Sequence, residues 1–97
     1  MAWIFEIEDK SGRKIHLSDE RLKHLNQEHP EIAPYLEDIQ ETLKNPLKIT
    51  TYEFDENVKY YYKYFKERGA AKYLIVIVKY LNNHGFIITA YFVKNIR

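Results

Sequence analysis

The hydrophobic period changes after Pro46, and no other feature of the chain restricts its fold as strongly. From there on, apolar residues recur with a period of two in four segments rich in β-branched and aromatic residues. These segments are LKITTYEF, VKYYYKYFK, AKYLIVIVKYL and FIITAYFVKNI. The turns DEN, ERGA and NNHG between them have the short lengths that are typical of hairpins. The second half therefore predicts four antiparallel strands in a meander.

The first half predicts a hairpin and two helices. AWIFEIED and RKIHLS have the composition of short strands, and KSG between them offers a turn. Ser18 fits the N-cap of a helix that ends at His29, because Pro30 disfavours helical geometry in the residue before it. EIAPYLEDIQETLKN has apolar residues at helical spacing and ends before Pro46. We predict one α+β domain over residues 1–97: an N-terminal β-hairpin, two helices, then a four-stranded antiparallel meander sheet covered on one face by the helices.

Length and composition exclude several classes of protein. A chain of 97 residues can bury one core but leaves no room for a second domain. The absence of cysteine rules out disulfides and thiolate metal sites and suits a reducing cytoplasm. No apolar run reaches the roughly 18 residues of a membrane span, and the N-terminus lacks a basic signal-peptide region. We therefore expect a soluble, cytoplasmic protein that does not contact a membrane.

The net charge of +1 conceals a separation of charge along the chain. Up to Glu56 there are 7 Lys/Arg and 13 Asp/Glu, a net charge of −6; from Asn57 onward 8 Lys/Arg accompany a single acid, Glu67, a net charge of +7. A basic half with interleaved aromatic residues suits a phosphate-bearing partner, because neutralised phosphates release counterions and bases stack on exposed rings. The alternative is that acidic helices simply pack on a basic sheet, and the charges leave both interpretations open.

The last predicted strand carries two hydroxyl groups on one face. Alternation assigns its residues to two sets. These are Ile87, Thr89, Tyr91 and Val93 on one face, and Phe86, Ile88, Ala90 and Phe92 on the other. The second set is wholly apolar and is expected to meet the helices. Thr89 and Tyr91 then lie on the open face, although both residue types also favour strands without any functional reason.

In VKYYYKYFK, one alternating set must also pack on the helices. Since lysine is almost never fully buried, we expect the tyrosines at positions 60, 62 and 64 to face the core. Lys59, Tyr61 and Lys63 would then face outward. For the following segment, AKYLIVIVKYL, the two faces are not distinguished by sequence. If the open faces coincide, Lys63, Thr89 and Tyr91 form one basic, hydroxyl-bearing surface.

The first predicted helix offers groups that could handle a phosphate. Arg21 and His24 are three residues apart and so project from one side of the helix, where they could bind a phosphate and move a proton. The alternative for each is an ordinary solvated surface residue. His24 and His29 are five apart, not four, and no carboxylate completes a ligand set, so we expect no metal site. The chain has no glycine-rich phosphate loop, and we expect no nucleotide or other cofactor.

Five motifs follow one another along the chain from Ile15: IHLSDERLKHLNQEHPEI, LKNPLKI, KYYYKYFK, KYLIVIVKY and GFIITAYFVKNI. Their order resembles that of small nucleases of the barnase/EndoU/colicin/RelE superfamily, particularly the branch associated with phages and mobile elements. The shared features are an R..H....HPE helix, an NP before the sheet, a VVVK-like strand and a terminal TAY. The resemblance implies a metal-independent, toxin-like endoribonuclease. In such enzymes the ribose 2′-hydroxyl attacks the adjacent phosphate and leaves a 2′,3′-cyclic phosphate.

The resemblance also implies roles for individual residues. His24 would be the general base or acid, and Arg21 would bind the scissile phosphate. Thr89 and Tyr91 would position the ribose or base, and either Lys63 or Lys72 would supply charge to the transition state. The further residues expected to bind substrate are Lys72, Tyr61 and His29. His29 and His84 both remain candidates for a second catalytic histidine.

Two other classes of function fit the same sequence. A non-catalytic RNA-binding module could use the basic sheet without turning RNA over. A protein-interaction module could instead use the acidic residues Glu37, Asp38 and Glu41 of the second predicted helix. If the chain is a ribonuclease, its substrate is RNA, such as transfer or messenger RNA, and an antitoxin or immunity protein is an expected partner.

Overall fold

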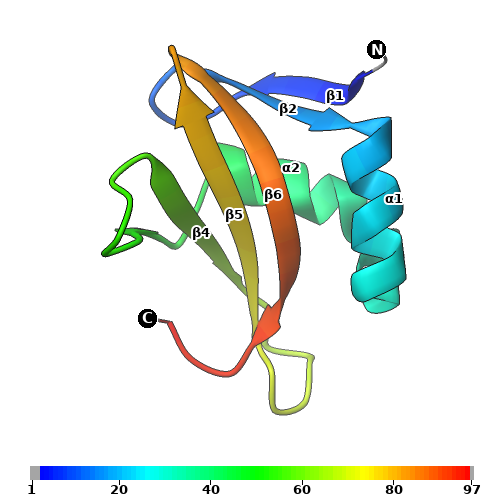
Figure 1. The fold of residues 1–97 in the computed structure, drawn as a ribbon. Helices are drawn as coiled ribbons and strands as arrows, with labels where there is room; N and C mark the ends of the chain where they lie inside the picture. Colours follow the sequence, from blue (N-terminus) through cyan, green and yellow to red (C-terminus); the bar gives the residue numbers. More distant parts are fainter. Residues whose placement is uncertain (1–2, 97) are drawn as a thin grey trace.

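The strands form one continuous sheet, and the N-terminal hairpin belongs to it. The computed structural model describes residues 3–96 and places six strands in the order β1-β2-β6-β5-β4-β3 (Figure 1). The strands are β1 (Trp3–Glu8), β2 (Lys14–Ser18), β3 (Lys48–Thr51), β4 (Val58–Tyr64), β5 (Tyr73–Leu81) and β6 (His84–Val93). Neighbours are antiparallel except β2 and β6, which pair in parallel over residues 14–16 and 84–86. The predicted α+β class and element order are confirmed, and the parallel pair extends the predicted four-stranded sheet to six strands.

The helices begin and end largely where the sequence predicts. Helix α1 (Asp19–Glu28) is capped by Ser18, whose hydroxyl accepts a hydrogen bond from the Arg21 amide at 3.1 Å, and it ends at His29. The next turns form a 3-10 helix, η1 (Pro30–Tyr35), before helix α2 (Leu36–Lys44). The second α-helix therefore starts later than predicted, because Pro34 has no amide hydrogen for the helical ladder. None of the helices within residues 3–96 is long and apolar enough to cross a membrane.

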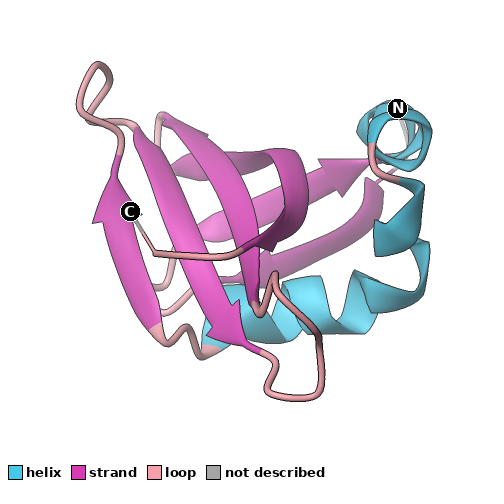
Figure 2. Ribbon diagram, turned by 90° about the horizontal axis from the view of Figure 1, so that it is seen from below, coloured by secondary structure: helices cyan, strands magenta, loops and turns pink. Residues whose placement is uncertain are grey.

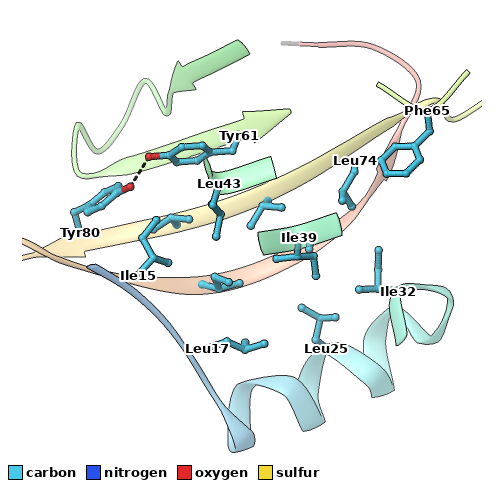
Figure 3. Close-up of a cluster of buried hydrophobic side chains, with 14 residues drawn as sticks. Ile15, Leu17, Leu25, Ile32, Ile39, Leu43, Tyr61, Phe65, Leu74 and Tyr80 are labelled. Atoms are coloured by element: carbon cyan, nitrogen blue, oxygen red, sulfur yellow. Dashed lines mark hydrogen bonds between the residues drawn. The ribbon is translucent and has the colours of Figure 1, made fainter. Parts of the chain in front are cut away.

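The core lies between the sheet and α2. Helix α2 packs on β4 and β5, behind the sheet in Figure 1, while α1 stands beside β2 and β6. Figure 2 shows α2 below the curved sheet and α1, seen nearly end-on, beside it. We call the side of the sheet that faces α2 the core face and the opposite side the outer face. Labelled core residues in Figure 3 are Ile15, Leu17, Leu25, Ile32, Ile39, Leu43, Tyr61, Phe65, Leu74 and Tyr80.

Strand β4 faces the opposite way to the prediction. Tyr61, which was expected to face outward, lies in the core and is only 2% exposed. Its hydroxyl donates to the buried Asp9 carboxylate at 3.1 Å, which removes the cost of burying that polar group. Lys63 shares the core face and lies 6.0 Å from the ring of Phe65. The proposed surface of Lys63, Thr89 and Tyr91 was therefore wrong, since the lysine lies on the other side of the sheet.

A β-bulge in β6 changes which residues of that strand face the core. The Cα pairs on either side of the bulge are Ile77–Thr89 and Val78–Ile87. Ile88 is the extra residue between them, and such an insertion reverses the alternation beyond it. Ile87 therefore joins the core, and Phe86 turns to the outer face, the reverse of the prediction. Thr89 and Tyr91 lie on the outer face, as predicted.

Gly85 makes the parallel contact between β2 and β6 possible. A Cβ atom at this position would lie 2.9 Å from Tyr80 and 3.0 Å from both Ile15 and Val78. We predict that Gly85→Ala lowers the free energy of unfolding by about 1–3 kcal/mol, measured by urea denaturation, because the core must shift to make room. Gly69→Ala is the matched control, since its Cβ would meet nothing within 4 Å. Equal losses in the two variants would contradict this account.

Candidate functional site

The outer face is hollowed where the start of α1 meets the sheet. The hollow has a volume of about 550 Å³. Its lining residues are His16, Ser18, Arg21, Lys79, Leu81, Phe86, Ile87 and Ile88. Two cations and an imidazole thus surround a partly apolar floor. Such a hollow can bind an anion with a flat, apolar substituent.

Helix α1 brings Arg21 to the hollow and carries His24 on the same flank. The Ser18 cap fixes the start of the helix, and Arg21 follows in its first turn at the edge of the hollow. His24 is three residues further along the same flank and is exposed to solvent. The sequence predicted that these two side chains share one flank, and the structure brings Arg21 to the sheet.

Lys79 is a second cation of the hollow and was not among the predicted site residues. It lines the hollow from β5 and forms an ion pair with Asp55 of the β3–β4 loop. The hydrogen bond from Lys79 holds the pKa of the Asp55 carboxyl below its ordinary value. In the sequence, Lys79 alternates onto the same strand face as Ile75 and Ile77. The structure pairs these two residues with Tyr91 and Thr89, so Lys79 shares the outer face with them.

Tyr91 and His29 form a stacked pair at the far end of α1 from the hollow. Their ring centroids are 5.0 Å apart and their planes differ by 20°. Thr89 lies between this pair and the hollow on β6, and its enclosed hydroxyl has no hydrogen-bond partner in the described part of the chain. Helix α1 and strand β6 run side by side (Figure 1). Thr89, Tyr91 and His29 therefore extend from the hollow as a strip between this helix and this strand.

A chain of one carboxylate and two imidazoles borders the opposite end of the hollow. Glu6 Oε2 lies 3.1 Å from His16 Nδ1, and His16 Nε2 lies 3.1 Å from His84 Nδ1. The two imidazole rings stack with centroids 5.4 Å apart. His16 is 5% exposed, whereas His84 lies open to solvent at the β5–β6 turn. No local pattern in the sequence indicates a role for His16, because its partner His84 comes from a distant part of the chain.

Three of the predicted site residues lie away from this strip. Lys63 and Tyr61 are on the core face, as described above. The Lys72 ammonium donates to the carbonyl oxygens of Lys66 and Arg68, at 3.1 and 2.8 Å, and closes the β4–β5 loop. None of the three is placed to act with Arg21.

Asp9, in the turn after β1, contacts strands β4 and β5 on the core face. Its carboxylate accepts hydrogen bonds from Ser11, the Arg13 amide and the hydroxyls of Tyr61 and Tyr80 (Figure 3 shows the contact between these hydroxyls). Burial alone would raise the pKa of Asp9, but these hydrogen bonds hold it below its ordinary value. Burial first, and then the adjacent carboxylate, raise the pKa of Tyr61 to about 12. The two hydroxyls therefore remain donors, and the cluster is structural.

Among residues 3–96, no group of three or more His, Asp or Glu side chains is placed to hold a metal ion.

Comparison with known proteins agrees with the resemblance found in the sequence. No curated protein and no solved structure matches the chain. The family model described as phage-Barnase-EndoU-ColicinE5/D-RelE like nuclease2 matches residues 5–96, which include both helices and nearly all of the sheet. The chain therefore belongs to this family of phage-associated nucleases and is a nuclease that acts on nucleic acid.

Proposed function

We propose that the protein is a metal-independent endoribonuclease that cleaves RNA by attack of the ribose 2′-hydroxyl on the adjacent phosphate. The observation that carries the proposal is the convergence of Arg21, Lys79 and His16 on one hollow. Two cations can stabilise the charge that develops on the phosphorane oxygens, and imidazoles transfer protons near neutral pH. The substrate would be cytoplasmic RNA, either transfer or messenger RNA.

The hollow and the strip along α1 and β6 offer groups that would bind the phosphate, act as the general base and position the nucleotide. The scissile phosphate would lie between Arg21 and Lys79. His24, on the same flank of α1, would take the proton from the 2′-hydroxyl as general base. The stacked pair of Tyr91 and His29 offers aromatic faces for a neighbouring base, as single-stranded RNA requires. Thr89, beneath the strip, offers its unpaired hydroxyl for positioning.

Such an activity would damage the RNA of the cell that makes the protein. The proposal therefore includes a toxin-like role and a protein partner, an antitoxin or immunity protein, that covers the hollow. A partner of this kind would have to present acidic groups to Arg21 and Lys79.

The test is cleavage of mixed transfer and messenger RNA by purified protein in EDTA, with chemical mapping of new 3′ ends. We expect 2′,3′-cyclic phosphate ends from the wild type, and a rate lower by about 100-fold in His24→Ala because a general base is lost. Tyr91→Phe tests the tyrosine hydroxyl separately from the ring. Lys23→Ala, an exposed cation of the same helix outside the hollow, is the control and should keep the wild-type rate. Intact RNA that still binds the wild type would contradict catalysis and favour the RNA-binding alternative.

A further inference from the structure

We infer that His84 is the general acid of this site, and that His16 and Glu6 are positioning residues that hold it in the acidic form. The inference rests on the proposed ribonuclease function and adds the group that protonates the leaving oxygen. It is carried by the chain Glu6–His16–His84, in which both contacts measure 3.1 Å.

The contacts determine where protons can lie along this chain. The Glu6 carboxylate lies 3.1 Å from His16 Nδ1 and favours a proton on that nitrogen. His16 Nε2 then accepts a hydrogen bond from His84 Nδ1, 3.1 Å away. When His84 is an imidazolium, its Nδ1–H points to the lone pair of His16 Nε2. The Glu6 carboxylate beside His16 makes this lone pair more basic. The Nε2–H of His84 can reach a substrate, because His84 is exposed to solvent whereas His16 is buried.

His84 contacts two residues that line the hollow. It stacks on His16, and its Cα partner in the β5–β6 hairpin is Leu81; both of these residues line the hollow. His24 lies on the other side of Arg21, further along α1. A phosphate bound to Arg21 would therefore have an imidazole on each side, as an in-line displacement needs.

Several charged groups face this chain from the elements around it. Lys14 on β2 lies 3.7 Å from the Glu6 carboxylate and shares it with His16. Arg21 on α1 and Lys79 on β5 line the same hollow as His16. The positive charges of these three residues disfavour an imidazolium at His84, whereas the negative charge of Glu6 favours it.

The proposed reaction moves one proton from the substrate to His24 and one from His84 to the leaving group. His24 takes the proton of the 2′-hydroxyl as the bond from that oxygen to phosphorus forms. The bond from phosphorus to the 5′ oxygen breaks, and His84 Nε2 gives its proton to that oxygen. The products are a 2′,3′-cyclic phosphate and a 5′-hydroxyl, and exchange with water returns each imidazole to its starting state.

The experiment compares two substrates that differ only in their leaving group. One is a dinucleotide, whose 5′ oxygen needs a proton to leave; the other is a nucleoside 3′-(4-nitrophenyl phosphate), whose phenolate leaves without one. We expect His84→Ala to slow cleavage of the dinucleotide by about 100-fold and cleavage of the aryl ester by only a few-fold. Equal losses on both substrates would overturn the assignment of His84 as the acid, and so would wild-type rates on both.

The positioning residues are tested by the pH dependence of the rate. Loss of the acid's proton produces the alkaline limb of the profile. In Glu6→Ala and His16→Ala this limb should move to lower pH on the dinucleotide, because the imidazolium of His84 loses its support. Glu8→Gln, an exposed glutamate two residues further along β1, is the control and should keep the wild-type limb. An unmoved limb in the Glu6 and His16 variants, with the fold intact by circular dichroism, would overturn the positioning role.

The two proposals fail in different ways. If the wild type cleaves neither substrate, the ribonuclease function is wrong and the role of His84 falls with it. If the wild type cleaves both substrates and His84→Ala matches it, only the present inference is wrong.

Discussion

Replacing Lys79 by alanine is expected to slow RNA cleavage by about 100- to 1,000-fold, the usual effect of removing one group that stabilises transition-state charge. Lys79 reaches the hollow from β5, opposite Arg21 on α1, so the two cations approach a bound phosphate from different elements. The loss should appear mainly in kcat, because the phosphorane carries more charge than the bound phosphodiester. Single-turnover cleavage at saturating protein measures it directly.

The ion pair with Asp55 provides the control for this prediction. Asp55→Asn removes the same ion pair but leaves the ammonium group in the hollow. Because the pair is partly exposed, we expect both variants to keep nearly the wild-type stability. Cleavage should fall far less in Asp55→Asn than in Lys79→Ala. If both variants lose the same activity, Lys79 acts through Asp55 and the loop rather than on the phosphate.

Local signals in the sequence were sufficient for the order of the elements. Ser18 caps α1 through a contact three residues away, and the hairpin turns need only their own residues. The parallel pairing of β2 with β6 joins segments about 70 residues apart, and no local pattern indicates it. The bulge at Ile88 likewise depends on the partner strand, and a single extra residue was enough to exchange the faces of Phe86 and Ile87.

The candidate site was predictable to the extent that it lies on one helix. Arg21 and His24 follow from helical spacing alone. The face of β4 was predicted wrongly because lysine burial was the only criterion, whereas the buried Asp9 makes Tyr61 a satisfied core residue. Lys79 and the contact between His16 and His84 depend on strand register, which the sequence does not state.

Asp9→Ala is expected to lower the free energy of unfolding at neutral pH by about 3 kcal/mol, the value of strong hydrogen bonds to a buried charged group. The carboxylate accepts from Ser11, Arg13, Tyr61 and Tyr80, and so ties the β1–β2 hairpin to β4 and β5. The guanidinium of Arg13, 3.6 Å from the ring centre of Tyr80, closes the same cluster. Urea denaturation of both proteins measures the difference.

The pH dependence of that difference follows from the lowered pKa of Asp9. An unfolded aspartate titrates near 3.8, and the folded group titrates below this value, so unfolding takes up a proton in acid. The stability that the carboxylate contributes is therefore complete above pH 3.8 and is lost as the pH falls through the folded pKa. The difference between wild type and Asp9→Ala should shrink in acid, whereas Glu67→Ala, an exposed carboxyl in the β4–β5 loop, should match the wild type throughout. A difference that stays constant into acid would mean that the shape of the Asp9 side chain, and not its charge, holds the hairpin to the sheet.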